Sequence, residues 1–446
     1  MNYDTSEEAI WKPPAYSFAS EPALASVSTL KDDGFPRNAQ WTLDGSAVLV
    51  QCEDHTLQVF DSFIGGDVLK PTISIPQPGP VVATQWFPAA SKENPAAYCL
   101  VASVRDTPVK LLDASNGRLR ASYPIVDHRE RQIAPQSLAF TFPGDKLYCG
   151  FEDAIEVFDV GRPGEGTRLH TTPSRKSKDG LKGIISSLAF SSFYGSEDSL
   201  FAAGTFSPVP GNIALFTESQ GETPAMYIGG GPRAGVVQMQ FNPMRPYVLY
   251  AAYRATGAGL IYSWDIRTNV DLPLAIYDSR PRTDMEGTGR PVDAEASRRN
   301  QRMSFGLDVG GRYLGIGNWA GEISVFDLEK AEGNITEEPS QEGDVEKRGP
   351  EFRFSAHKDT IGSVSFRPWN SQILSVSGSR HWPEDEDSGS SGDEEEQRDA
   401  SEPQPSRYQK RAPKPVVSFD SSMKLWECQP KADANATGTG SPIVVV

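Results

Sequence analysis

The chain has 446 residues, 43 basic and 59 acidic side chains, and a formal net charge of −16 at neutral pH. This length allows two or three average domains or one large domain of repeated units. Forty glycines and 35 prolines favour a turn-rich β protein over a long-helix protein, because chain reversals need special backbone angles. No apolar run approaches the roughly 18 residues of a membrane-spanning helix, and the first residues do not resemble a secretory signal.

The negative charge is concentrated in two segments. Residues 384–396 carry eight acidic side chains and no basic one, and residues 329–346 form a second acidic stretch. Both are interpreted as solvated, disordered linkers. The rest of the chain is much closer to neutral, so the overall charge does not exclude nucleic-acid binding.

The four cysteines form neither a CxxC pair nor a Cys/His cluster with zinc spacing. We therefore expect reduced, partly buried thiols, as in an intracellular protein. The sequence predicts no metal site and no other cofactor.

One short pattern recurs seven times along the chain. It is a strand of alternating apolar and polar residues that ends in an aromatic residue or leucine, usually followed by an acid. Most spacings lie slightly above the roughly 40–45 residues of a four-stranded propeller blade, and the last is about double because the acidic segment lies inside it. The copies are residues 57–61, 109–113, 155–159, 213–217, 261–265, 323–327 and 423–427.

Further strands accompany each copy. An apolar strand ending in an aromatic residue lies upstream, as in residues 137–140, and a second apolar strand follows a turn, as in residues 47–50. Another strand comes after the repeated one, as in residues 119–123. We therefore predict an all-β fold, a seven-bladed WD-repeat β-propeller, with strands a to d in each blade.

The expected domain organisation follows from this repeat. Residues 1–14 are predicted to be a disordered N-terminus and residues 428–446 a flexible tail. The propeller is predicted to span residues 15–427, with an acidic linker at 329–350 and a disordered acidic insertion at 381–415 in blade seven.

Blade seven lacks its own fourth strand, because the chain after Trp426 runs into a Pro-containing, Thr/Gly/Ser-rich tail. An open sheet edge would be a liability. We predict that an N-terminal strand at residues 16–20 closes the ring, and residues 443–446 are the competing candidate.

Blade seven also has the fullest polar signature of the repeat. In WD repeats, a histidine, a serine, an aspartate and a tryptophan form a buried hydrogen-bond network that joins the strands of a blade. A structural role is therefore expected for His357, Ser377, Asp420 and Trp426. The five histidines form no recognisable nucleophile–base or metal-ligand motif, and residues 315–320 read as a hairpin rather than a dinucleotide loop. We therefore predict a protein without catalytic residues that is not an enzyme.

Several segments together resemble the telomerase Cajal body protein family of WD-repeat proteins, which includes fungal nuclear relatives linked to splicing. The resemblance covers roughly residues 35–427, and the closest stretch is residues 105–168. The acidic segments differ in detail and the N-terminus is short. The matching segments include residues 105–108, 117–123, 149–151, 157–159, 161–164, 183–190, 264–267, 300–303 and 377–380.

The resemblance implies a non-catalytic nuclear adaptor that binds small Cajal-body-type RNA (scaRNA or telomerase RNA) and helps to localise or assemble the ribonucleoprotein. The implied location is the Cajal body or the nucleoplasm, and an additional cytoplasmic location is an open alternative. The expected partners are small nuclear RNA and ribonucleoprotein proteins, with no membrane and no small-molecule substrate. The alternative is a protein–protein scaffold that supports spliceosomal particles without touching RNA.

RNA binding needs basic side chains for phosphates and flat groups for stacking on bases. Three basic connectors lead from a d strand into the next a strand, before blades three, four and six. Such connectors lie on one face of a propeller, so together they predict a basic face, although any one loop could carry solubilising charges only. The candidate RNA-binding residues are Arg129 and Arg131, then Lys176, Lys178 and Lys182, then Arg280, Arg282, Arg298, Arg299 and Arg302.

The acidic insertion contains Ser390 and Ser391, each followed three residues later by an acid. Acidophilic kinases favour this pattern, and phosphates would add negative charge. Either the insertion competes with RNA for the basic face, or it is a tolerated surface loop.

Overall fold

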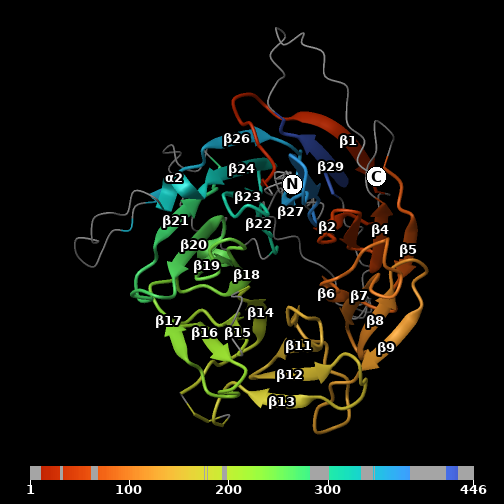
Figure 1. Ribbon diagram of the computed structural model, residues 1–446, viewed down its shortest axis with the longest axis vertical. Helices are drawn as coiled ribbons and strands as arrows, with labels where there is room; N and C mark the ends of the chain where they lie inside the picture. Colours follow the sequence, from red (N-terminus) through yellow and green to blue (C-terminus); the bar gives the residue numbers. More distant parts are fainter. Residues whose placement is uncertain are drawn as a thin grey trace, which may run out of the picture.

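The computed structural model describes residues 12–30, 34–61, 69–174, 176–177, 179–192, 198–281, 301–332, 345, 347–381 and 418–429. Seven antiparallel sheets follow one another in a ring around a central opening (Figure 1). The predicted seven-bladed β-propeller is therefore confirmed.

Each blade contains four consecutive antiparallel strands, apart from blade seven. Blade one consists of β2 (Pro36–Trp41), β3 (Ala47–Cys52), β4 (Thr56–Asp61) and β5 (Ile73–Pro76). Blade two consists of β6 (Val81–Trp86), β7 (Cys99–Val104), β8 (Val109–Asp113) and β9 (Leu119–Tyr123). Blade three consists of β10 (Ser137–Phe140), β11 (Lys146–Phe151), β12 (Ala154–Asp159) and β13 (Thr167–His170).

The second half of the ring repeats this plan. Blade four consists of β14 (Ile185–Phe190), β15 (Leu200–Thr205), β16 (Ile213–Thr217) and β17 (Met226–Ile228). Blade five consists of β18 (Val236–Phe241), β19 (Val248–Tyr253), β20 (Leu260–Asp265) and β21 (Ala275–Asp278), and the short 3₁₀ helix η1 (Ala255–Gly257) follows β19. Blade six consists of β22 (Gly306–Leu307), β23 (Tyr313–Gly317), β24 (Glu322–Asp327) and β26 (Phe352–Ser355). Blade seven consists of β27 (Ile361–Phe366), β28 (Gln372–Ser377), β29 (Ser422–Glu427) and β1 (Ala23–Thr29).

Each sheet is covered on both faces by its neighbours in the ring, and the second strand of a blade is the most buried. Every residue of β3, β7 and β19 is buried. This burial explains why such strands read as continuous apolar runs rather than as alternating ones.

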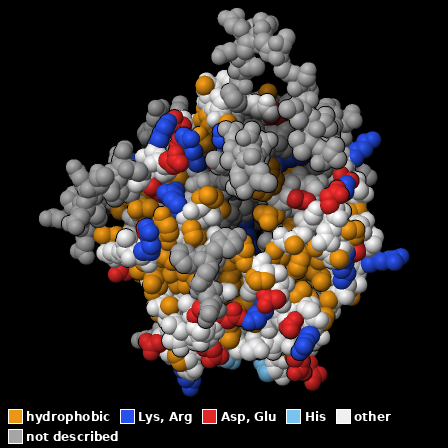
Figure 2. All heavy atoms as spheres, in the orientation of Figure 1, with side chains coloured by type: hydrophobic (Ala, Val, Ile, Leu, Met, Phe, Trp, Pro, Cys, Tyr) orange, Lys and Arg blue, Asp and Glu red, His pale blue; other side chains and the backbone are white. Residues whose placement is uncertain are grey.

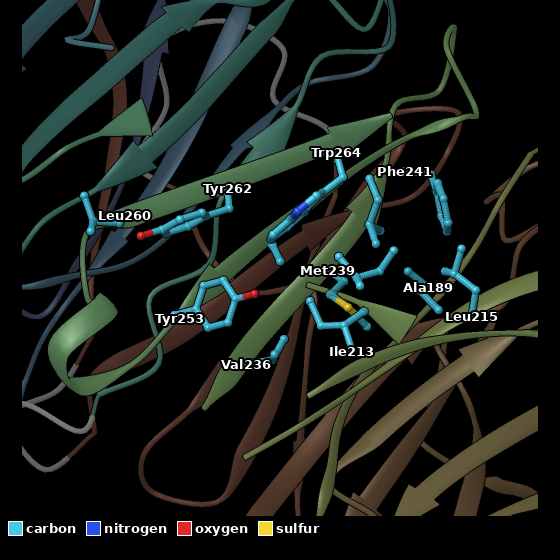
Figure 3. Close-up of a cluster of buried hydrophobic side chains, with 14 of the residues drawn as sticks. Ala189, Ile213, Leu215, Val236, Met239, Phe241, Tyr253, Leu260, Tyr262 and Trp264 are labelled. Carbon is cyan, nitrogen blue, oxygen red and sulfur yellow. The ribbon is translucent and has the colours of Figure 1, made fainter. Parts of the chain in front are cut away.

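The contact between blades four and five illustrates the core. Figure 3 shows Ile213 and Leu215 of β16 lying close to Met239 and Phe241 of β18 and to Trp264 of β20. All five side chains are at most 5% exposed. Burying an aliphatic or aromatic side chain of this size contributes about 1.5–3 kcal/mol, so these inter-blade layers hold the ring together.

The ring is closed by an N-terminal strand, as predicted, but the strand lies further along the chain. β1 pairs antiparallel with β29, with Leu24 opposite Trp426 and Thr29 opposite Ser422. The predicted segment 16–20 instead packs its aromatic side chains between blades six and seven. The ring centroid of Tyr16 lies 5.5 Å from that of Tyr313 and 5.3 Å from that of Phe366. The competing residues 443–446 lie outside the described residues.

The blade-seven network contains a different serine from the one predicted. The imidazole Nε2 of His357 lies 2.8 Å from the Ser375 hydroxyl, which also accepts a 2.9 Å hydrogen bond from the Trp426 indole N–H. The other imidazole nitrogen, Nδ1, lies 3.2 Å from Asp420 Oδ2. Ser377 donates instead to the carbonyl of Asp359, because it stands two residues further along β28, beside the connector rather than beside the indole.

The acidic linker before β26 is not wholly solvated. Its first residues form the short helix α2 (Leu328–Glu332), and the side chain of Glu332 is only 3% exposed. The hydroxyls of Tyr250 and Tyr277 donate to Glu332 Oε1 at 2.8 and 2.7 Å, and Arg245 pairs with Oε2 at 2.5 Å. Further along, β25 (Lys347–Arg348) adds a parallel fifth strand to blade five.

Deletion of residues 1–30 removes β1 and leaves the outer edge of β29 unpaired. We expect the melting temperature, measured by circular dichroism, to fall on the order of 10 °C. Deletion of residues 1–11 is the control and should have little effect, because it leaves β1 and Tyr16 in place. An unchanged melting temperature in the longer deletion would show that β1 does not close the ring.

Ser375→Ala leaves the Trp426 indole N–H and the His357 Nε2 without their shared partner. We expect the free energy of unfolding, measured by urea denaturation, to fall by about 1–3 kcal/mol for each group left unsatisfied. Ser365→Ala on the neighbouring strand is the matched control, since the Ser365 hydroxyl has no hydrogen-bond partner in the part of the chain that is described. Removal of this hydroxyl leaves no hydrogen-bond partner among the described residues unsatisfied, so Ser365→Ala should lower the free energy of unfolding less than Ser375→Ala does. Equal losses in the two variants would contradict the assigned network.

Candidate nucleic-acid interface

Two sets of loops share one face of the ring, which we call the connector face. It carries the d-to-a connectors and the turns between strands b and c, because antiparallel b and d strands end on the same side. Backbone hydrogen bonds join the two sets: Arg105 N–H to Pro80 O, Asp153 N–H to Gly183 O and Arg254 N–H to Gly235 O, each at 3.0 Å. The main described segments of this face are residues 53–55, 77–80, 105–108, 124–136, 152–153, 171–174, 179–184, 206–212, 229–235, 254–259, 301–304, 318–321 and 356–360.

The blade-three connector carries one paired and one exposed arginine. The guanidinium of Arg131 binds Asp127 Oδ2 at 2.9 and 2.8 Å, while its side chain remains 69% exposed. Hydrogen bonds from the Arg131 backbone and side chain lower the pKa of Asp127 to about 2. Arg129 donates its backbone N–H to the same carboxylate, and the residue is exposed. This loop therefore presents one partly balanced cation and one outward-facing cation.

The blade-four connector places two of its three predicted lysines on the connector face. Lys176 and Lys182 are both exposed, and the Lys182 ammonium donates to the Ser177 carbonyl at 3.4 Å. Lys178 lies outside the described residues.

The blade-six connector differs most from the predicted basic loop. The guanidinium of Arg280 donates to Asp278 Oδ1 at 2.9 Å and to Oδ2 at 2.5 Å, and the Asp278 side chain is only 2% exposed. This carboxylate balances the charge of Arg280, so Arg280 is a weak candidate for a phosphate contact. Arg282, Arg298 and Arg299 lie outside the described residues.

Arg302 lies at the mouth of the central channel. Its guanidinium donates to Gln136 Oε1 at 3.0 Å and lies 4.9 Å from the ring centroid of Phe206. Burial, followed by the charges of Arg37 and Arg254, lowers the pKa of Arg302 to about 10. These neighbours come from blades one, three, four and five, so the side chain reaches across the ring.

Sequence reasoning missed two of the arginines nearest the axis. Arg254 follows strand β19 in a b–c turn, and its guanidinium stacks 4.2 Å from the ring centroid of Phe206. Arg37 lies in β2 and pairs with Glu53 at 3.4 Å. Neither belongs to a basic run, and their position after or within a predicted strand was the only available signal. The connector face also exposes Arg105 and Arg233.

A serine, a histidine and an aspartate meet beside blade seven, but their geometry differs from a catalytic triad. The same nitrogen, His381 Nε2, lies 2.8 Å from the Ser379 hydroxyl and 3.0 Å from both Asp359 carboxylate oxygens. A nucleophilic triad needs the serine on one ring nitrogen and the carboxylate on the other. The arrangement therefore gives no support for nucleophilic catalysis.

Asp359 instead holds together the described ends of the acidic insertion. Its Oδ2 accepts a 3.0 Å hydrogen bond from the Phe419 backbone N–H, and the Phe419 ring lies 4.0 Å from the His381 ring. The insertion therefore starts and ends in a b–c turn, on the connector face. Ser390 and Ser391 lie outside the described residues.

Other kinds of site find no support in the described residues. No group of three or more His, Cys, Asp or Glu side chains in them is placed to hold a metal, and no helix among them is long and apolar enough to cross a membrane. All four cysteines are buried free thiols, and burial raises the pKa of Cys52 and Cys428 to about 12. Thiols of this kind are inert rather than nucleophilic.

Comparison with known proteins gives relatives over most of the chain. Telomerase Cajal body protein 1 of Mesocricetus auratus is 27% identical over 401 residues, 87% of this chain. The human protein of the same name is 27% identical over 392 residues, 85% of this chain. The resemblance to the telomerase Cajal body protein family is confirmed.

The telomerase Cajal body proteins are longer than this chain, which spans 66% and 64% of the two relatives named above. A fungal protein, "Guanine nucleotide-binding protein negative regulator 1" of Schizosaccharomyces pombe, is 24% identical over 301 residues, which cover 64% of this chain and 71% of that protein. No protein-family model matches the chain.

Proposed function

We propose that this protein is a non-catalytic nuclear adaptor that binds small RNA of the Cajal-body class through its connector face. The RNA would be a scaRNA-like or telomerase RNA, and the protein would help to localise or assemble its ribonucleoprotein. The proposed location is the Cajal body or the nucleoplasm, and the proposed further partners are ribonucleoprotein proteins. The names of the relatives support this location and this class of particle.

The observation that carries the proposal is the cluster of arginines at the channel mouth, surrounded by exposed cations on the connectors. Arg129, Lys176 and Lys182 are exposed on the connectors before blades three and four, the same blades that provide the Gln136 and Phe206 contacts of Arg302. Phosphates of single-stranded RNA bind such cations, and the flat guanidinium and Phe206 groups are suited to stacking.

A protein–protein scaffold is the second candidate, and a different face favours it. Large apolar side chains stand exposed at the turns between strands a and b in four blades: Leu43, Phe142, Met244 and Trp369 are 49–64% exposed. These turns lie on the face opposite the connectors. Figure 2 shows hydrophobic side chains gathered around the centre of one face of the ring. Exposed apolar patches of this kind commonly mark protein contacts, and one adaptor can use both faces.

Reversal of three connector charges tests the proposal: Arg129→Glu, Lys176→Glu and Lys182→Glu combined. If each cation contacts one phosphate, the affinity for single-stranded RNA should fall at least about tenfold, and the slope of log K against log salt should fall by about 2. Fluorescence anisotropy with a labelled oligonucleotide over a salt series measures both quantities.

The control reverses Lys92, Arg267 and Lys330, which are paired with carboxylates away from the connector face. It should retain the wild-type affinity and salt slope. Equal weakening in both variants would mean nonspecific attraction to the whole surface. If crosslinking and sequencing in cells recovered no enriched small RNA, the scaffold function would replace the proposed one.

A further inference from the structure

The segment at the start of blade six bridges the channel mouth. Gln301 Nε2 donates to the Gly378 carbonyl in blade seven at 2.7 Å, and the Ser304 N–H donates to the Gly362 carbonyl at 2.8 Å. Between them, Arg302 reaches the Gln136 side chain on the other side of the ring. Contacts of Gln301 and Ser304 with blade seven on one side, and of the Arg302 guanidinium with Gln136 on the other, therefore hold this segment across the channel mouth.

Three arginines from different blades converge at this point. Arg254 and Arg302 stack on the same Phe206 ring, at 4.2 and 4.9 Å from its centroid. The Arg37 backbone lies against Gly362, whose carbonyl accepts the Ser304 N–H. The charges of Arg37 and Arg254 both lower the pKa of Arg302. Like charges in a partly buried site repel one another, so some other interaction must offset this cost.

The described residues provide few negative charges to do so. Among them, no carboxylate pairs with Arg254 or Arg302, and Glu53 is shared between Arg37 and Arg380. Among the described side chains at this point, the positive charges therefore exceed the negative ones by at least two. Phe206 and Gln136 orient the guanidinium groups that carry this excess charge. Groups arranged in this way are suited to bind an anion.

We propose that Arg37, Arg254 and Arg302 form a phosphate-binding site at the axis of the propeller. This inference rests on the proposed function in one respect: the bound group in the cell is a backbone phosphate of the small RNA. A phosphate fits better than a carboxylate because it offers oxygens in several directions, whereas a carboxylate is planar. The three arginines come from three different blades.

A phosphate held at the axis would position the RNA strand. From there the strand can continue over the connectors of blades three and four, where Arg129, Lys176 and Lys182 are exposed. The central site would then fix one nucleotide, and the surrounding cations would add affinity that depends on salt.

The test measures binding of inorganic tripolyphosphate to the full chain by calorimetry, and stabilisation by the same anion in thermal unfolding. Wild-type protein should bind and be stabilised, and Arg302→Gln and Arg254→Gln should each weaken binding about tenfold or more, the loss of one charge-assisted contact. Arg267→Gln, on the opposite face, should bind like wild type. For the binding of single-stranded RNA to Arg302→Gln, the slope of log K against log salt should be less steep than in the wild type by about 0.7.

Several outcomes would overturn the site. These are a wild-type protein that tripolyphosphate does not stabilise, an undiminished effect in both arginine variants, or equal binding of polyglutamate, which would point to an acidic protein segment. If Arg302→Gln did not fold, Arg254→Gln would decide. If tripolyphosphate bound through these arginines but RNA did not bind at all, the phosphate site would stand and the proposed RNA function would fail.

Discussion

The pairing of β1 with β29 is the constraint on which the rest of the structure depends. The last sheet obtains its fourth strand from the opposite end of the chain, and this strand covers the outer edge of β29. This pairing ties residues separated by almost the whole chain length, so every blade is packed between two neighbours. The buried layer between blades seven and one, which includes Val50 and Leu374, lies next to this closure.

Closure also divides the protein into two chemically different faces. The connector face gathers arginines and lysines from separate blades, and three arginines meet at its centre. The opposite face exposes apolar residues at the turns between strands a and b, such as Leu43 and Trp369. The proposed adaptor would use one of these surfaces for the nucleic acid and the other for a protein.

The fold was largely predictable from sequence because the c-strand pattern recurs seven times, at spacings of 46–62 residues apart from the last one of 100. The closing strand was misplaced because Tyr16 and Phe18 look like strand residues, whereas their rings fill the gap between blades six and seven. Glu332 lay in an acidic run that indicated solvent, yet Arg245 and two tyrosines stabilise it in the core. Such long-range partners leave no local sequence pattern.

The candidate interface was predictable only in part, for the same reason. The basic connectors stand out as short runs, so Arg129 and Lys182 could be named from sequence. Arg37 and Arg254 are single residues more than 200 positions apart, and only the ring brings them near Arg302. Ser377 was predicted as the serine of the blade-seven network in place of Ser375, because the two serines are two residues apart and point to the same side of β28.

The central claim is that RNA lies on the connector face, over the channel mouth. Ultraviolet crosslinking of the protein to bound RNA, followed by mass spectrometry of the crosslinked peptides, tests it most directly. The account predicts crosslinks in residues 124–136, 171–184, 206–212 and 254–259, with Phe206 among the crosslinked residues. Crosslinks confined to the a–b turns around Leu43, Phe142 and Met244 would contradict it.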